Sequence, residues 1–264
     1  NQVRPYELEA GAADAAVRAG MDLLLEDMNA GKGLTYPSMC RNFERIIALF
    51  TPIPVTKEPK VRVGVVGEIY VKYSPLGNNN LEEFLLSEGA EPVVPGIIDF
   101  MIFKFYNRDV DVDLYGGKRL KQKICRIGMD YMEKCQRALI AALSATDRFR
   151  APGTFDDLHR LIQGYLGDGN KMGEGWLLTA EMLELIHSGV PNIVCAQPFG
   201  CLPNHVVGKG MIRKLKDDYP NSNIVAIDYD PGATKINQEN RIKLMLANAR
   251  GLKKQQTPAE SVPV

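Results

Sequence analysis

Apolar and polar positions follow two different rhythms along this chain of 264 residues. In residues 12–28 and 38–50, apolar side chains recur every three or four positions, which predicts two amphipathic helices. A proline-rich connector, TPIPVTKEPK, then leads to a short β-branched run at residues 61–68. This change predicts a helical segment over residues 1–52, packed on a main domain that begins with a strand.

Short apolar runs alternate with helical patterns through the rest of the chain. After the first strand, the runs EPVV, NIVCAQ and NIVAIDYD read as three more strands. Helices are expected at residues 81–88, 97–106, 177–187, 205–218 and 236–248, and one long or two short helices at 117–145. This alternation predicts the α/β class: a doubly wound, mostly parallel four-stranded sheet with helices on both faces, plus the N-terminal helical segment.

The domain boundaries follow from the same pattern. A Rossmann-like α/β domain is expected over residues 61–250, with a helical insertion at about 109–170. Residues 251–264 are polar and are predicted to form a flexible tail.

Composition excludes several classes of function. Lys plus Arg and Asp plus Glu number 32 each, so no overall field favours nucleic acid. No apolar stretch approaches the roughly 20 residues of a membrane span, and no signal peptide opens the chain, so a cytoplasmic location is expected. Because the first residue is Asn and not Met, the sequence is interpreted as a processed or excised part of a larger protein.

The cysteines are odd in number and irregularly spaced. The five are Cys40, Cys125, Cys135, Cys195 and Cys201. Without secretion signals, they do not suggest a disulfide framework. They are predicted to be reduced thiols or metal ligands.

Polar side chains gather where the first and third strands end. In a doubly wound sheet, ligands bind beyond the carboxyl ends of the strands, where strand order reverses. If the first strand is central, the loops GEIYVKYSPLGNNN and QPFGCLPNH flank that crevice. They offer Glu68, Tyr70, Lys72, Asn78, Gln197, Cys201, Asn204 and His205.

Each of these residues has a functional and an ordinary interpretation. Glu68 is a candidate general base or a hydrogen-bonding partner of a substrate, or an exposed residue at a strand end. Lys72 suits a coenzyme A phosphate, since lysine acts as a point charge toward such groups. Tyr70, Asn78 and Gln197 are candidates to line a substrate pocket, or they simply cover the end of the sheet.

The two cysteines of NIVCAQPFGCLPNH differ in position along the strand. Cys195 lies inside the strand and is expected in the core. Cys201 lies beyond the strand end, ahead of a helix N-terminus, where a thiolate is favoured. The spacing C-x5-C is not a zinc-knuckle pattern. An iron–sulfur cluster remains possible because its three or four thiolates can come from distant loops. His205 either pairs with the thiol or caps the helix.

Two stretches, GEIYVKYSPLGNNNLEEFLLSEGAEPVVPGI and AQPFGCLPNHVVGKGMIRKLK, carry a family resemblance. They resemble the C-terminal, dehydratase-like part of large proteins known as activators of (R)-2-hydroxyglutaryl-CoA dehydratase. More remotely, they are similar to subunits of 2-hydroxyacyl-CoA dehydratases and benzoyl-CoA reductases. The likeness spans most of the chain and is strongest over residues 61–106 and 171–246.

The resemblance implies a function. In such proteins, cysteines from separate α/β domains hold a [4Fe–4S] cluster that receives an electron from an ATP-driven activase. Dehydratase members use that electron for the reductive radical elimination of water from a 2-hydroxyacyl-CoA. Cys201 in PFGCLP matches a cluster-ligand position, and Cys195 is a weaker candidate because it is close by. The chain is then expected to form one wall of the site, to work with other domains of a parent protein and a dehydratase or electron-donor partner, and to have little activity alone.

The sequence departs from a complete member of this family. It lacks the cysteine motifs of a preceding domain and the nucleotide-binding domains of the activase. Cys40 is either a further ligand or a packing residue, whereas Cys125 and Cys135 are spaced as residues of a helix face. These gaps leave a second hypothesis open, a non-catalytic docking or ligand-binding module of the same larger protein.

A third hypothesis comes from DYDPGATK, which resembles the phosphate loop of actin-like ATPases. That loop joins two strands of a hairpin, whereas a helix is predicted after this segment. Asp228 and Asp230 are therefore interpreted as strand-end residues, with Gly232 and Thr234 shaping the turn.

Overall fold

The computed structural model of the protein describes residues 1–230 and 232–256. These residues form two compact units, each built from two separate stretches of the sequence. The helical unit comprises residues 1–59 and 95–169, and the sheet unit comprises residues 60–94 and the described chain from Asn170 onward. The second stretch of the helical unit thus begins at Pro95, before the expected start of the insertion near residue 109.

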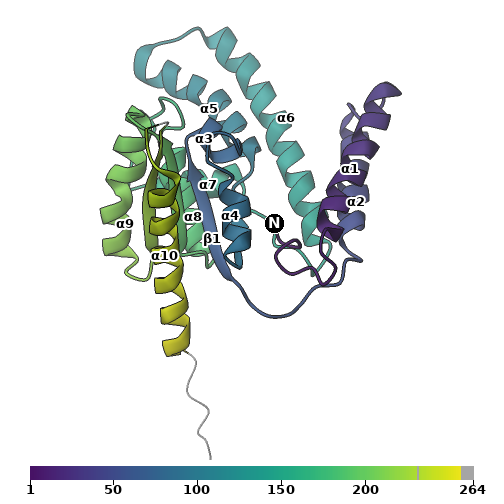
Figure 1. The fold of residues 1–264 in the computed structure, drawn as a ribbon. Helices are drawn as coiled ribbons and strands as arrows, with labels where there is room; N and C mark the ends of the chain where they lie inside the picture. The colour runs from purple at the N-terminus through teal and green to yellow at the C-terminus, as the bar shows by residue number, and fades with distance from the viewer. Residues whose placement is uncertain (231, 257–264) are drawn as a thin grey trace, which may run out of the picture. The chain divides into compact units, whose positions relative to one another are not determined.

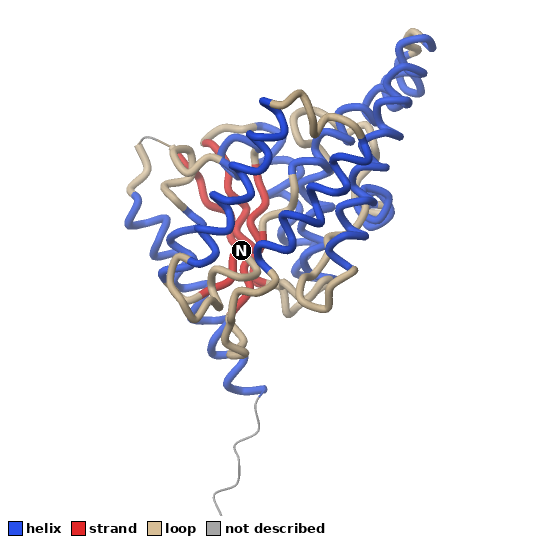
Figure 2. Tube along the Cα trace, turned by 90° about the vertical axis from the view of Figure 1, so that its right-hand side faces the viewer, coloured by secondary structure: helices blue, strands red, loops and turns tan. Residues whose placement is uncertain are grey.

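Four strands form one parallel sheet in the sheet unit (Figures 1 and 2). They are β1 (Val61–Gly67), β2 (Ala90–Val93), β3 (Asn192–Pro198) and β4 (Asn223–Tyr229), in the order β2-β1-β3-β4. All three strand pairs are parallel. The α/β fold class and the four strands are therefore confirmed, and the condition that the first strand is central is met.

Alternation along the strands gives the sheet two covered faces. On one face, Val63 and Val65 belong to a buried cluster that includes residues of α4 (Leu81–Ser87) and α10 (Lys235–Gln256). On the other face, Gly64 lies so close to Leu185 of α8 (Leu177–His187) that an added Cβ would be 2.5 Å from its Cδ1. Helices thus cover both faces, as a doubly wound sheet requires.

The segment after β3 differs from the single helix expected at residues 205–218. It contains a π-helical turn η1 (Asn204–Gly208), a 3₁₀ turn η2 (Lys209–Met211) and the short α9 (Ile212–Asp218). Periodicity along a sequence does not distinguish a π turn from α-helix. Such turns are frequent at functional sites.

Helix α10 also differs from its prediction. It runs to Gln256, so residues 251–256 continue the helix and do not belong to a flexible tail. Residues 257–264, the rest of the predicted tail, lie outside the described residues.

Helices form the other unit. They are α1 (Ala12–Asn29), α2 (Tyr36–Phe50), α5 (Ile97–Tyr115), α6 (Arg119–Ser144) and α7 (Phe155–Ile162). The region expected to form one or two helices is one helix, α6, and α5 extends nine residues beyond its expected end at residue 106. Helix α7 was not predicted. Thr154 and Asp157 form a capping box at its start, and the hydrogen bonds from Thr154 lower the pKa of the Asp157 carboxyl.

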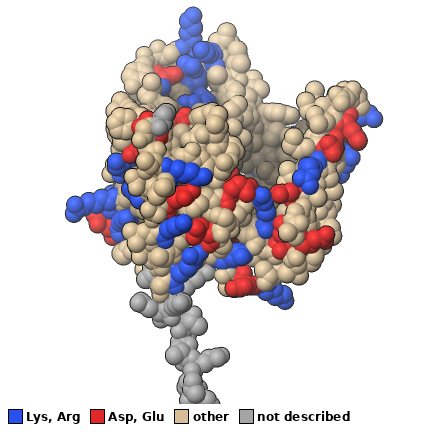
Figure 3. Space-filling model, viewed as in Figure 1, with Lys and Arg blue, Asp and Glu red and all other residues tan. Residues whose placement is uncertain are grey.

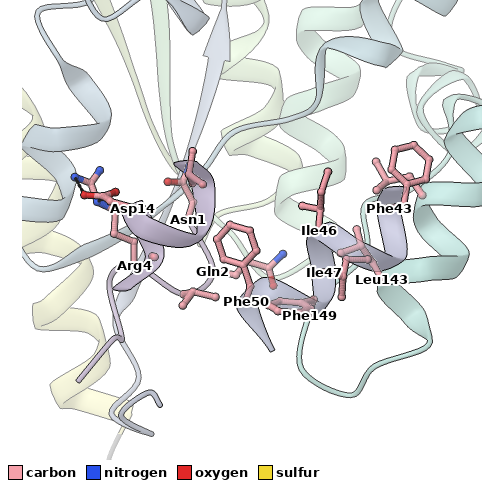
Figure 4. Close-up of a pocket in the computed structure, with 14 residues that line it drawn as sticks. Asn1, Gln2, Arg4, Asp14, Phe43, Ile46, Ile47, Phe50, Leu143 and Phe149 are labelled. Carbon is pink, nitrogen blue, oxygen red and sulfur yellow. Dashed lines mark hydrogen bonds and ion pairs between the residues drawn. The ribbon is translucent and has the colours of Figure 1, made fainter. Parts of the chain in front are cut away.

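A cavity of about 490 Å³ opens in the helical unit (Figure 4). Its wall is mostly apolar and includes Phe43, Ile46, Ile47, Phe50, Leu143 and Phe149. The Arg4–Asp14 ion pair, with 3.2 Å between Nε and Oδ1, lies at one end of the group of residues drawn. These apolar residues come from α2, α6 and the loop after α6, and all of them are only partly buried.

Candidate functional site

The carboxyl ends of β1 and β3 mark the reversal of strand order. From β1 the chain continues outward to β2, and from β3 it continues to β4 on the opposite side. This is the topological switch point at which open α/β sheets bind ligands. The loops after β1 and β3, in which the candidate residues were identified, therefore lie at the predicted edge.

Cys201 lies on the loop between β3 and η1 and is partly exposed. The side-chain amide of Asn204 donates a hydrogen bond from Nδ2 to Cys201 Sγ at 3.3 Å. The backbone also fixes this cysteine: its N–H donates to Pro198 O at 3.3 Å, and its carbonyl accepts from the N–H of His205 at 3.0 Å. The sulfur is thus held in a defined position, with one polar donor and partial access to solvent.

Exposed apolar side chains surround Cys201 in the sequence. Phe199, Leu202 and Val206 are 76%, 72% and 55% exposed. Large apolar side chains of this kind cluster at surfaces that contact another molecule.

Cys195 occupies a different environment. It is fully buried within β3, in the core position predicted for it. Burial, with smaller contributions from Glu181 and Asp228, raises the pKa of its thiol to about 12. The thiol is therefore protonated at neutral pH, and its burial inside the strand leaves no surface at which a cluster shared with another domain could reach the sulfur.

The two thiols are expected to react at different rates. Iodoacetamide should alkylate Cys201 in the folded protein, and it should alkylate Cys195 only after denaturant is added, because the thiolate is the nucleophile. Both cysteines lie in one tryptic peptide, residues 172–209, so mass spectrometry with fragmentation of that peptide over time assigns the label to each sulfur and measures both rates. Equal labelling of Cys195 and Cys201 in the native protein would contradict the described burial.

A buried ion pair lies behind the loop that follows β1. Lys72 of α3 (Ile69–Tyr73) is 3% exposed, and its Nζ is 2.7 Å from Oε1 of Glu181 in α8. Burial raises the pKa of Glu181, and the ammonium of Lys72 opposes this effect. Glu174 lies nearby, where its Oε1 accepts from the backbone N–H of Ile69 at 3.0 Å. Lys72 was predicted to face a phosphate, but its ammonium is instead turned into the core.

Glu68 and Asn78 organise the chain between β1 and α4. Glu68 is the N-cap residue of α3, and its Oε2 accepts from the N–H of Val71 at 2.9 Å. Asn78 is 4% exposed; its Nδ2 donates to Val71 O at 2.8 Å, and its Oδ1 accepts from the N–H of Leu81 at 3.0 Å. Glu68 therefore caps α3, whereas Asn78 joins α3 to α4 and is too buried to contact a substrate.

The remaining two predicted pocket residues, Tyr70 and Gln197, differ in their exposure to solvent. Tyr70 is 56% exposed, next to Gly77. Gln197 is fully buried, and its Nε2 donates to Asp228 Oδ1 at 2.5 Å. The Oε1 of Gln197 and the Oδ1 of Asn204 are buried without a hydrogen-bond partner among the described residues. Buried acceptors without a partner are uncommon in a purely structural core.

The segment DYDPGATK does not form a phosphate hairpin. After β4, the N–H of Ala233 donates to Asp230 O, and Thr234 O accepts from the N–H of Asn237 as α10 begins. A helix therefore follows β4, as expected, and no second hairpin strand pairs with it in the described chain.

Sequence reasoning missed several polar residues. Glu174 and Glu181 had no recognisable motif, since each becomes relevant only through a contact made by folding. In the helical unit, Tyr106 donates to Asp168 Oδ2 at 2.7 Å, and His159 Nε2 lies 3.1 Å from Asp168 Oδ1. Burial raises the pKa of the Tyr106 phenol, so this cluster contains a neutral tyrosine.

A complete cluster site requires more ligands than the sheet edge supplies. Within residues 1–230 and 232–256, no group of three or more His, Cys, Asp or Glu side chains is placed to hold a metal ion. Cys40, Cys125 and Cys135 belong to the helical unit, on α2 and α6. At the sheet edge, Cys201 alone among the described cysteines has the exposure that a ligand needs.

The surface charge is mixed. On the face drawn in Figure 3, Lys and Arg side chains alternate with Asp and Glu side chains over much of the surface. None of the helices described has both the length and the apolar composition to cross a bilayer. No known protein family, curated protein or solved structure matches the chain.

Proposed function

We propose that the sheet unit provides one wall and one cysteine ligand, Cys201, of a [4Fe–4S] site in a protein of the 2-hydroxyacyl-CoA dehydratase system. The observation that carries this proposal is the hydrogen bond from the buried amide of Asn204 to the partly exposed sulfur of Cys201. Hydrogen bonds to ligand sulfurs are a principal means by which proteins set the potential of such clusters.

The surroundings of Cys201 support the same proposal. The sulfur lies at the switch point of the sheet, and exposed Phe199 and Leu202 flank it in the sequence. A cluster bound there would supply low-potential electron transfer. This chain would hold the sulfur in place, and the apolar side chains would exclude water once another domain covered them. The remaining thiolates would come from other domains or chains.

The exposed apolar side chains also favour the alternative function, a docking module of the same larger protein without a cluster ligand. In that case, Phe199, Leu202 and Val206 would contact another domain, and Cys201 would be an ordinary thiol. The two functions predict different iron contents for the same substitution.

The test uses the protein at its natural length, isolated without oxygen. Cys201→Ala is expected to abolish the broad visible absorption of the cluster and to lower the bound iron and sulfide, because a cubane cluster needs three or four thiolates. Cys195→Ala is the control, six positions away in the same segment, and should keep the cluster. Unchanged iron in Cys201→Ala, with the protein folded, would exclude Cys201 as a ligand and favour docking.

A further inference from the structure

A second pocket lies in the helical unit, at the turn between α1 and α2. These two helices lie side by side (Figure 1), and the turn contains the sequence GKG. The pocket has a volume of about 320 Å³. It is lined by Asp27, Gly31, Lys32, Gly33, Leu34, Thr35, Ser38, Arg41, Asn42 and Arg45. In contrast to the apolar cavity of Figure 4, this basic-turn pocket has a largely polar and charged lining.

The backbone of the turn leads into a helix N-terminus. Gly31 and Gly33 have φ values of 65° and 88°, a conformation that glycine adopts without strain. Helix α2 then begins at Tyr36, and no side chain caps its first turn. The first N–H groups of a helix have no partner within the helix and carry partial positive charge, so they favour an anion.

Two buried polar side chains point to a ligand independently of the helix terminus. Ser38 and Asn42, one turn apart on the same face of α2, line the pocket and are only 8% and 5% exposed. Asn42 Oδ1 accepts a hydrogen bond from Arg45 Nη1 at 3.3 Å. Its Nδ2 and the hydroxyl of Ser38 have no hydrogen-bond partner among the described residues. Neither atom is among the enclosed side-chain atoms without a partner, so both reach the open space of the pocket, where a bound group can accept hydrogen bonds from them.

The charges in the pocket favour an anion. Lys32, Arg41 and Arg45 are opposed by a single carboxylate, Asp27, which leaves a surplus of two positive charges. Asp27 pairs with Arg45, with 3.2 Å between Oδ2 and Nη1. Lys32 and Arg41 have no ion-pair partner in the described part of the chain. The unpaired charges therefore belong to the two residues at the glycine turn and the first turns of α2.

We propose that the basic-turn pocket binds the phosphate group of a small phosphate ester. Phosphate presents several strong acceptor oxygens, which match a hydroxyl, an amide, two cations and a helix N-terminus. The volume lies at the lower end of the roughly 300 to 1,000 Å³ typical of small-molecule sites, so it holds more than the phosphate itself. This site is in the helical unit and does not depend on the proposed cluster.

Calorimetric titration of the intact chain tests the site with inorganic phosphate and adenosine 5′-monophosphate at constant ionic strength. Both probes are expected to bind and to compete. Arg41→Glu should weaken the binding of both probes by about tenfold or more, because it replaces a cation of the pocket with an anion. A tenfold change in affinity corresponds to about 1.4 kcal/mol. Ser38→Ala removes one hydrogen bond and should weaken binding by about fivefold.

Arg18→Glu is the matched control. Arg18 is an exposed residue of α1 that does not line the pocket, and its reversal changes the net charge by the same amount as Arg41→Glu. Affinity within about twofold of the wild type is expected for this control. The proposal is overturned if neither probe binds, if adenosine monophosphate fails to compete with phosphate, or if Arg41→Glu and Arg18→Glu weaken binding equally while both variants keep the circular dichroism of the wild type.

Discussion

Lys72→Met is expected to lower the free energy of unfolding of the sheet unit by about 3 to 5 kcal/mol. The substitution keeps an unbranched side chain in a site that is 3% exposed but removes the ammonium 2.7 Å from Glu181. The carboxylate would remain fully enclosed and without its counter-ion. Breaking one partner of a buried pair costs more than the pair itself contributes, because the remaining charge stays desolvated.

Urea titration followed by tryptophan fluorescence measures this effect. Trp176 is the single tryptophan of the sequence, is fully buried, and belongs to the sheet unit. The double variant Lys72→Met with Glu181→Leu is the control, because it removes both charges. Its free energy of unfolding should lie within about 1 kcal/mol of the wild-type value or exceed it. If the double variant is no more stable than Lys72→Met, then the single variant loses stability through packing and not through the loss of charge compensation.

The same pair predicts a pH dependence in the single variant. In Lys72→Met, burial still raises the pKa of Glu181, while the ammonium that opposed this rise is absent. A carboxyl whose pKa is raised in the folded state contributes stability that is present below its unfolded pKa and lost as pH rises through its folded pKa. The difference in unfolding free energy between wild type and Lys72→Met should therefore be smaller in mildly acidic buffer than at neutral pH.

The strands and their direction were predictable because the signal is local. The β-branched run at residues 61–67 and the apolar runs at 192–198 and 223–229 are short and are separated by helical patterns. Such alternation requires crossover connections and hence a parallel sheet. The central place of β1, on which the position of the crevice depends, was a condition of the sequence argument, since alternation alone does not fix strand order; the structure meets that condition.

The environment of individual side chains was less predictable. Lys72 follows a strand and reads as a surface cation, but it meets Glu181, 109 positions later in the chain, in the core. Met21, Leu25 and Met28 recur at helical spacing, yet they are 58%, 52% and 61% exposed in the described structure, while Ala13 of the same helix is buried. Periodicity identifies a helix face but not the element, if any, that covers it.

The local conformation of helix ends could not be predicted from the sequence either. The short α3 begins where Glu68 caps it, and η1 is wound as a π turn around Asn204. Neither follows from composition, since both depend on a single side-chain hydrogen bond or on the packing of a neighbouring helix. These are the positions that hold Cys201 and the buried acceptors, so the least predictable backbone lies at the candidate site.

Among substitutions of glycine, Gly67→Ala is expected to disrupt the edge of the sheet most. Gly67 ends β1 with a φ of 148°, and an added Cβ would lie 1.8 Å from the carbonyl oxygen of Ala196 on β3. That oxygen belongs to backbone and accepts a hydrogen bond from the N–H of Glu68 at 3.1 Å, so it cannot turn away as a flexible side chain would. Relief of the overlap requires β1 and β3 to separate at the switch point.

The free energy of unfolding is expected to fall by about 3 kcal/mol or more in Gly67→Ala, because backbone strain and the loss of strand pairing add together. Gly251→Ala is the control in the same unit: this helical glycine has nothing within 4 Å of an added Cβ, and alanine should stabilise α10 by up to about 1 kcal/mol. Urea unfolding, read from Trp176 fluorescence, gives both values.

If Gly67→Ala keeps wild-type stability, β1 and β3 cannot approach each other at this point as closely as described, and the polar groups that follow them cannot share one edge. If stability falls as expected, the same variant should also make Cys201 and Cys195 more alike in their rates of alkylation, because opening the β1–β3 pair exposes the thiol of β3 to solvent.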